Sequence, residues 1–179
     1  MTRRAVFLDR DGVLAREIVR DNRAYAPTAL EDFALVDGVG EQVRRLQEAG
    51  LARLVFTNQP EVARGLLSWD TLDAMHQRLR DAAPIDEVYV CPHDQDDGCA
   101  CRKPSPGMLT TAAERWDIDL SRSFVIGDRW RDIEAGRAVG CCTILLERPY
   151  SECMTADHRV ATFAEAVDAV LEHLDRGEA

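Results

Sequence analysis

The stretch Phe7-Leu8-Asp9-Arg10-Asp11-Gly12 decides the fold, because it reads as a short buried strand that ends in two carboxylates and a glycine. The predicted strand, Ala5–Leu8, is entirely apolar, as expected for a strand covered on both faces. Side chains alternate along a strand, so Asp9 and Asp11 are predicted to face the same side, with Arg10 pointing away. Gly12 then allows the chain to turn sharply.

Two neighbouring carboxylates repel each other unless a cation lies between them. Mg²⁺ prefers oxygen ligands and is the cation we expect here. Asp9 could then attack phosphorus and form an aspartyl-phosphate, while Asp11 protonates the leaving oxygen and later deprotonates water. Taken alone, the pair fits a solvated turn equally well.

Four further short apolar runs predict strands, and amphipathic stretches between them predict helices. The strands are Arg53–Phe56, Glu87–Val90, Ser123–Ile126 and Cys142–Leu146. The helices are Gly38–Ala49, Ser68–Ala83, Ser105–Trp116, Arg129–Val139 and Thr162–Leu174, with Ser68, Ser105 and Thr162 as N-caps. This alternation predicts an α/β fold with a doubly wound, Rossmann-like parallel sheet in three layers. Without a linker or an internal repeat, residues 1–179 are expected to form one domain.

Polar residues also follow the later strand ends, where ligands bind in such sheets. The second strand runs into Thr57-Asn58-Gln59, whose hydroxyl and backbone N–H groups could bind a phosphoryl oxygen. After the third strand, Lys103 could neutralise a phosphoryl group and Arg102 could grip a substrate oxygen. After the fourth, Asp128 would complete the metal site, and Asp132 follows one helical turn later. Each motif has a commoner structural explanation by itself, but their order at successive strand ends favours phosphoryl transfer.

A compact cluster of metal-ligating residues precedes Arg102. Cys91, His93, Cys99 and Cys101 supply three thiolates and one imidazole, a complete tetrahedral set that is typical of structural zinc. Zinc would fix Arg102 and Lys103 just past the last ligand. Buried free cysteines with a surface histidine, or regulatory disulfides, are the alternatives.

Composition excludes several classes of function. A formal net charge of -10 argues against nucleic-acid binding, which needs a basic face. No apolar run is long enough to span a membrane, and the N-terminal residues lack the features of a signal peptide, so we expect a cytoplasmic location. The expected partner is a small phosphorylated metabolite, which a metal and a few local cations must attract. We expect a monomer, with a homodimer as the alternative.

In their order along the chain, the motifs Asp9–Gly12, Thr57, Lys103 and Gly127-Asp128 through Asp132 resemble those of the haloacid dehalogenase superfamily. The stretches Cys91-Pro92-His93 and Cys99–Pro104 narrow the resemblance to the branch of histidinol-phosphate phosphatases and D-glycero-D-manno-heptose 1,7-bisphosphate phosphatases, enzymes of small-molecule and carbohydrate metabolism. The branch lacks a large cap domain, and this chain has no room for one.

The resemblance implies a role for each matching residue. Asp9 would be the nucleophile and Asp11 the acid/base, and Mg²⁺ would be held by Asp9, the Asp11 carbonyl and Asp128. Phosphoryl stabilisation would come from Thr57 and Lys103, and support from Asp132. The substrate contacts would be Asn58, Gln59, Arg102 and, in the stretch Asn22–Tyr25, Arg23 and Tyr25.

The resemblance leaves the substrate open between heptose 1,7-bisphosphate, which we favour, and histidinol phosphate. A catalytically idle binding module on the same fold is the rival of another class. Of the remaining residues, we expect His76 and His173 at the surface, Trp69, Trp116 and Trp130 in packing roles, and Cys141 and Cys142 as small apolar groups.

Overall fold

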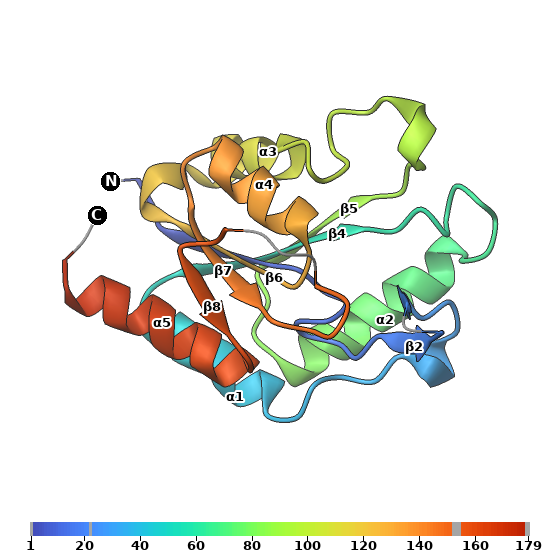
Figure 1. Ribbon diagram of the computed structural model, residues 1–179, viewed down its shortest axis with the longest axis horizontal. Helices are drawn as coiled ribbons and strands as arrows, with labels where there is room; N and C mark the ends of the chain where they lie inside the picture. The colour runs from blue at the N-terminus through green and yellow to red at the C-terminus, as the bar shows by residue number, and fades with distance from the viewer. Residues whose placement is uncertain (1, 22, 152–154, 178–179) are drawn as a thin grey trace.

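The computed structural model describes residues 2–21, 23–151 and 155–177, with the side chain of Arg23 left aside. Its main feature is a six-stranded sheet in which all neighbouring strands are parallel, in the order β5-β4-β1-β6-β7-β8 (Figure 1). The strands are β1 (Ala5–Leu8), β4 (Ala52–Asn58), β5 (Glu87–Cys91), β6 (Phe124–Gly127), β7 (Cys142–Leu146) and β8 (His158–Val160). The chain runs outward from β1 in both directions, which confirms the doubly wound topology.

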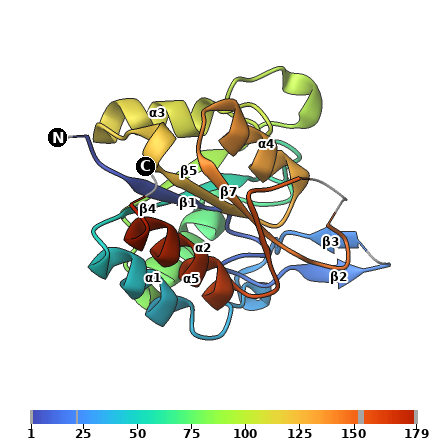
Figure 2. The ribbon, with the colours of Figure 1, turned by 60° about the vertical axis from the view of Figure 1, so that its left-hand side comes forward.

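Helices cover both faces of the sheet (Figures 1 and 2). One layer holds α3 (Gly107–Trp116) and α4 (Trp130–Ala138), and the other holds α1 (Val39–Glu48), α2 (Trp69–Ala82) and α5 (Phe163–Asp175). Strand β1 shows why two layers are needed: Val6 and Leu8 belong to the core on the α1 and α5 side, while Phe7 belongs to the core under α3. Every residue of β1 is buried, as its apolar sequence predicts.

The five predicted strands and five predicted helices all form, with small shifts at their ends. Strand β4 is longer than predicted, so Thr57 and Asn58 are its last residues, paired with Val90 and Cys91 of β5. Ser68 and Thr162 cap their helices as predicted. The prediction for Ser105 was wrong, because α3 begins at Gly107 and Pro106 occupies the N-cap position.

Three short strands had no sequence prediction. β2 (Ile18–Arg20) and β3 (Arg23–Tyr25) form an antiparallel hairpin inside the long segment after β1, and it projects beside the sheet in Figure 2. The third is β8, the edge strand beside β7. Within the described residues this hairpin and a 3₁₀ turn at Leu30–Asp32 are the regular structure inserted between β1 and α1, so no large cap domain is present there.

Four predictions about single residues need revision. His76 is buried at 3% exposure rather than at the surface. His173 is half-buried, and its ring packs edge-to-face on Phe124. Trp69 is 50% exposed and so contributes little packing. Arg10 was predicted to point away from the two carboxylates, but its guanidinium is fully buried and bonds Asp11. None of the described helices is both long and apolar enough to cross a membrane.

Candidate active site

Three acidic side chains and one lysine meet beyond the carboxyl ends of β1 and β6. The ammonium nitrogen of Lys103 lies 2.8 Å from Asp9 Oδ1 and 2.6 Å from Asp132 Oδ1, and it donates to the Phe56 carbonyl at 3.0 Å. Burial opposes the charge on Lys103, but the two carboxylates outweigh it and raise the pKa of this amine. Lys103 is therefore a fixed cation at the sheet edge.

The Asp9 carboxylate is held in one orientation, because its Oδ1 also accepts a hydrogen bond from the Arg10 backbone N–H at 2.8 Å. Burial and the nearby Asp132 raise the pKa of Asp9 to about 7. Burial and Asp9 likewise raise the pKa of Asp128. Without a further cation, these buried carboxylates oppose one another's ionisation.

The donor set at this position fits Mg²⁺. Carboxylate oxygens of Asp9, Asp128 and Asp132 lie within 4.8 Å of one another. Oδ1 of Asp128 is buried and has no hydrogen-bond partner, whereas its Oδ2 accepts from the Tyr150 hydroxyl at 2.8 Å. A buried carboxylate oxygen without a donor is costly, and a hard cation would satisfy it.

Gly12 is required by this arrangement. Its φ is +87°, and a Cβ there would lie 2.2 Å from Asp128 Oδ2 and 3.1 Å from the Tyr150 hydroxyl. Any side chain at position 12 would therefore displace the Asp128 carboxylate. The glycine of the opening motif is thus explained by a residue that lies more than one hundred positions later in the chain.

Asp11 is held by a fully buried arginine. Arg10 donates from Nε to Asp11 Oδ1 at 3.0 Å and from Nη2 to Oδ2 at 2.8 Å, and Gln59 donates to the same Oδ2 at 2.8 Å. Arg10 Nη1 lies 3.3 Å from Nε2 of His76, and the guanidinium stacks on the Phe33 ring. Burial and Arg10 lower the pKa of His76 to about 3, so this imidazole is neutral and can accept from Arg10.

The residues after β4 serve mainly to hold the site together. Gln59 is fully buried and bonds Thr57 Oγ1 as well as Asp11, so the structure places it beneath the cavity rather than on its wall. The Asn58 side chain accepts from the Lys103 backbone N–H at 3.1 Å and donates to the Lys103 carbonyl at 3.2 Å. Asn58 thereby clamps the segment that carries Lys103, and it also reaches the cavity wall.

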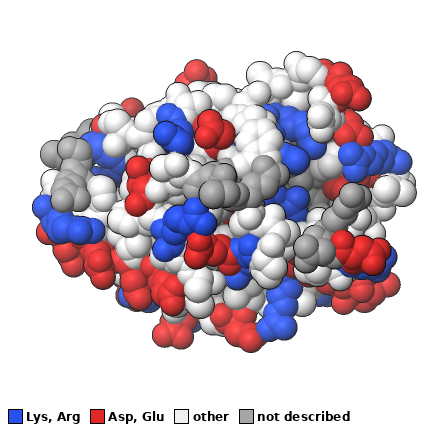
Figure 3. All heavy atoms as spheres, in the orientation of Figure 1, with Lys and Arg blue, Asp and Glu red and all other residues white. Residues whose placement is uncertain are grey.

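A cavity of about 270 Å³ opens above these groups. Predicted residues on its wall include Asp9, Thr57, Arg102 and Lys103, and Tyr25 reaches it from the β2–β3 hairpin. Sequence reasoning missed five charged side chains that line it: Glu17, Glu61, Arg64, Arg129 and Arg131. Figure 3 shows acidic groups crowded along the lower edge of the molecule, while basic groups are spread over its left and right halves.

Ion pairs hold two of the missed cations, Arg129 and Arg64. Arg129 lies 2.5 Å from Glu17, and Arg64 forms two hydrogen bonds to Asp94 at 2.6 and 2.7 Å. Arg23 was predicted to contact the substrate, but the structure describes only its backbone, and Asn22 and Cys153 lie outside the described residues. Spacing along the chain gave no signal for Glu17 or Arg64, because the hairpin and the loop after β4 bring them to the cavity.

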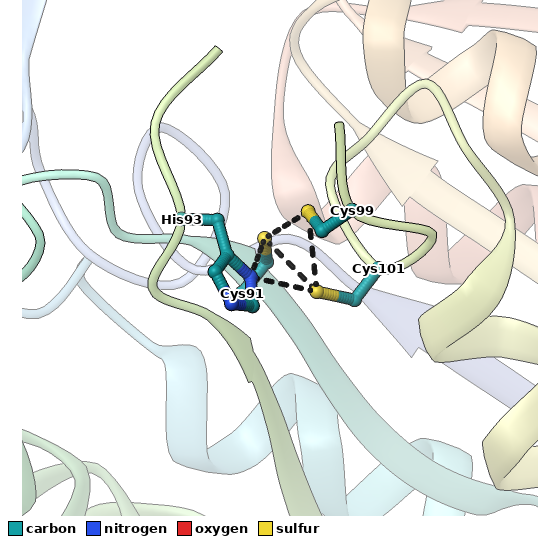
Figure 4. Close-up of side chains that lie close together, drawn as sticks. All are labelled: Cys91, His93, Cys99 and Cys101. Atoms are coloured by element: carbon teal, nitrogen blue, oxygen red, sulfur yellow. Dashed lines mark hydrogen bonds between the residues drawn. The ribbon is translucent and has the colours of Figure 1, made fainter. Parts of the chain in front are cut away.

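The four predicted zinc ligands converge on one point (Figure 4). Their sulfur atoms are 3.2–3.6 Å apart, and His93 Nδ1 lies 3.6 Å from Cys91 Sγ and 3.3 Å from Cys101 Sγ. Tetrahedral zinc holds such ligand atoms roughly 3.3–3.8 Å apart, so the cluster fits this ion.

The loop that carries the zinc ligands is hydrogen-bonded at two points to the segment that follows it. Arg102 donates to the His93 carbonyl at 2.9 Å. Gly107, the first residue of α3, donates to the Ala100 carbonyl at 3.1 Å, and a Cβ at position 107 would lie 2.2 Å from that oxygen. The loop, Lys103 and α3 therefore form one packed unit.

Comparisons with known proteins identify the family of this chain. A family model described as HAD-hydrolase-like matches residues 100–176. The D-glycero-beta-D-manno-heptose-1,7-bisphosphate 7-phosphatase of Pseudomonas aeruginosa is 40% identical over 152 residues, covering 82% of this chain and 83% of the relative. The D-glycero-D-manno-heptose-1,7-bisphosphate 7-phosphatase of Thermosynechococcus vestitus is 38% identical, with coverage of 97% and 98%. The solved structure of D,D-heptose 1,7-bisphosphate phosphatase from Bordetella bronchiseptica, complexed with magnesium and phosphate, is 30% identical with a TM-score of 0.81, covering 95% of this chain and 99% of that one.

A doubly wound sheet with Asp9, Lys103 and Asp132 in contact at its carboxyl edge defines a phosphatase of the haloacid dehalogenase class. Within that class, the chain belongs to the family of D-glycero-D-manno-heptose 1,7-bisphosphate 7-phosphatases, since its relatives match it over most of both chains. The predicted superfamily, branch and fold are confirmed.

Proposed function

We propose that this phosphatase removes the 7-phosphate of D-glycero-D-manno-heptose 1,7-bisphosphate through an aspartyl-phosphate on Asp9. The observation that carries the proposal is the contact of the Lys103 amine with both Asp9 and Asp132 at the base of the cavity. A nucleophilic carboxylate beside a buried, fixed cation suits attack on an anionic phosphoryl group. The relatives from Pseudomonas aeruginosa and Thermosynechococcus vestitus are named as 7-phosphatases of this heptose bisphosphate.

The reaction takes two steps. An oxygen of Asp9 attacks phosphorus, the bond from phosphorus to the C7 oxygen breaks, and Asp11 gives its proton to that oxygen. Asp11 then takes a proton from a water molecule, which attacks the phosphorus of the aspartyl-phosphate and releases inorganic phosphate. Lys103 and the Thr57 hydroxyl stabilise the charge that builds up on the phosphoryl oxygens.

Residues of this chain provide places for two metal ions. Asp9, Asp128 and the Asp11 carbonyl would hold Mg²⁺, which when bound neutralises charge on the phosphoryl oxygens. Cys91, His93, Cys99 and Cys101 would hold zinc in a closed structural site. Because Arg102 binds the His93 carbonyl, the zinc loop would fix Arg102 and Lys103 over the cavity.

The charges on the cavity wall favour a bisphosphate over histidinol phosphate. Histidinol phosphate carries an amine at the end remote from its phosphate, which would need an anionic wall. Here the wall beyond Lys103 carries four cations, Arg64, Arg102, Arg129 and Arg131, against two acids, Glu17 and Glu61, so cations are in excess by two. Guanidinium groups bind phosphate oxygens well, so they suit a second phosphate.

The test is phosphate release with Mg²⁺ from the two substrates side by side. We expect kcat/KM for heptose 1,7-bisphosphate to exceed that for histidinol phosphate by at least about 100-fold, roughly 2.7 kcal/mol of discrimination. Asp9→Asn should abolish turnover of both, whereas Asp37→Asn, a change at an exposed residue, should leave it intact. Equal or better turnover of histidinol phosphate would overturn the substrate assignment, and an active Asp9→Asn variant would overturn the nucleophile.

A further inference from the structure

A second group of metal-ligating side chains lies away from the active site. Cys142, His158 and His173 each offer a ligand atom, and these atoms lie within 4.8 Å of one another. The three residues come from β7, β8 and α5, which are separate elements. All three are half-buried.

The sheet register explains why they converge. Cys142 and Ile144 are two residues apart in β7 and so point to the same face. His158 of β8 pairs with Ile144, which puts its side chain on that face as well. α5 packs over this face, and the His173 ring is held edge-to-face against Phe124 at 5.2 Å, where Phe124 is the β6 partner of Cys142.

Most of the cysteines and histidines of this chain lie in two clusters in the folded structure. The sequence holds six cysteines and four histidines. Seven of these ten residues fall into the two clusters of potential ligands, four beside Lys103 and three here. His76 is committed to Arg10, and Cys141, the neighbour of Cys142, packs into the core on the opposite face of the sheet.

We propose that Cys142, His158 and His173 bind a second zinc ion. One thiolate and two imidazoles are the ligand types that zinc prefers, and three protein ligands leave a fourth position for water. Tetrahedral zinc holds such atoms roughly 3.3–3.6 Å apart, so the side chains need to close by no more than about 1.5 Å. The oxygen-preferring Mg²⁺ of the active site has no suitable donor here.

The position of this site indicates a structural task. Cys142 begins β7, so the cluster lies towards the amino-terminal ends of the strands, whereas the catalytic groups follow the carboxyl ends. The edge strand β8 has three residues, and its neighbour Asp157 binds the backbone and hydroxyl of Thr143. A zinc ion would join this short edge strand to β7 and to the last turns of α5, and so stabilise the carboxyl-terminal part of the fold.

The experiment compares the metal content of the full chain with that of matched variants. Wild type, Cys142→Ser, His173→Gln and Cys141→Ala are purified without chelator, equilibrated with free Zn²⁺, and assayed for bound zinc by mass spectrometry. We expect Cys142→Ser and His173→Gln each to hold one zinc ion fewer per chain than wild type. Cys141→Ala, which removes the neighbouring thiol from the other face, should match wild type.

Two further measurements guard against misfolding and against the other zinc site. Zn²⁺ at about 100 times its dissociation constant should raise the Tm of wild type by roughly 5–10 °C more than that of Cys142→Ser. In a Cys99→Ser background, Co²⁺ should still give a thiolate charge-transfer band that disappears when Cys142→Ser is added. Equal zinc content and equal Co²⁺ spectra with and without Cys142 would overturn the proposal, whatever the state of the Cys91 cluster and whichever substrate the enzyme uses.

Discussion

Arg10 offers the sharpest test of how this site is built. Its guanidinium is fully buried, so it cannot touch a substrate, yet both of its hydrogen bonds to a carboxylate go to Asp11. If Asp11 is the acid and base, Arg10 acts through it by fixing the carboxylate in one orientation. Arg10→Lys keeps the positive charge and removes the planar fork.

The structure sets the size of the effect. Hydrogen bonds to charged groups contribute about 1.5–3 kcal/mol each, and a lysine can replace at most one of the two that reach Asp11. A loss of about 1.5–3 kcal/mol in positioning corresponds to a fall in kcat of roughly 10- to 100-fold. Lysine also loses the contacts with His76 and the Phe33 ring, so we expect the Tm to fall by roughly 5–10 °C.

The assay is steady-state phosphate release with saturating Mg²⁺, together with thermal unfolding. Arg10→Lys should lower kcat while KM stays within about twofold, because the lost interaction lies outside the substrate cavity. The matched control is Arg53→Lys. Arg53 also pairs with an aspartate, Asp86, at 2.7 Å, but at the opposite end of β4, so its variant should lose stability without losing kcat. If Arg10→Lys keeps a kcat within about twofold of wild type, or raises KM alone, Arg10 does not position Asp11.

The remaining predictions concern pH and metal. The pKa of Asp9 is raised to about 7, so without metal the folded chain holds a proton that the unfolded chain releases near pH 4. This group therefore favours folding at low pH and loses that contribution as pH rises through 7. The gain in Tm on adding Mg²⁺ should be larger at pH 8 than at pH 5.5, and a gain that does not change with pH would contradict the metal site. His76 has its pKa lowered to about 3, so the stability that it contributes is lost as pH falls from about 6.5, and His76→Gln should flatten the fall in Tm between pH 6.5 and 4. Cys99→Ser should release zinc and lower kcat/KM by at least about tenfold through disorder at Lys103, and full activity in a zinc-free variant would refute the linkage.

The sequence carried enough information for the sheet and the catalytic carboxylates because both follow from local patterns. Strand β1 is apolar at every position and is followed directly by Asp9, and a parallel sheet brings the ends of neighbouring strands together. That reasoning placed Lys103 and Asp132 near Asp9 without knowledge of any contact. The contacts of Lys103 with Asp9 and Asp132 agree with that placement, and Asn58 holds the loop that carries Lys103 in position.

The missed features depend on contacts between distant segments. Strict alternation predicted that Arg10 points away from its neighbours, but its long side chain curls back to Asp11 because burial would otherwise leave a charge unpaired. His76 is one polar position on an amphipathic helix, and only Arg10 beneath it explains its burial. Strand β8 has three residues of mixed polarity, which are too few to show the alternation of apolar and polar side chains that predicts a strand. Its pairing with β7 determines its conformation.

The charge balance of the cavity explains how a protein of net charge -10 can bind an anion. Its wall carries five basic side chains and five acidic ones, so these groups sum to zero: Arg64, Arg102, Lys103, Arg129 and Arg131 against Asp9, Asp11, Glu17, Glu61 and Asp132. Arg64, Lys103 and Arg129 are held in place by carboxylates. With a sum of zero, the wall as a whole has no net attraction for a phosphate dianion. Asp128 lies beside Asp9 and Asp132 and brings the sum to -1. A divalent cation at Asp9 and Asp128 changes it to +1, which favours the binding of an anion. Metal and substrate binding should therefore be coupled, and the dissociation constant of inorganic phosphate should rise steeply when Mg²⁺ is withheld.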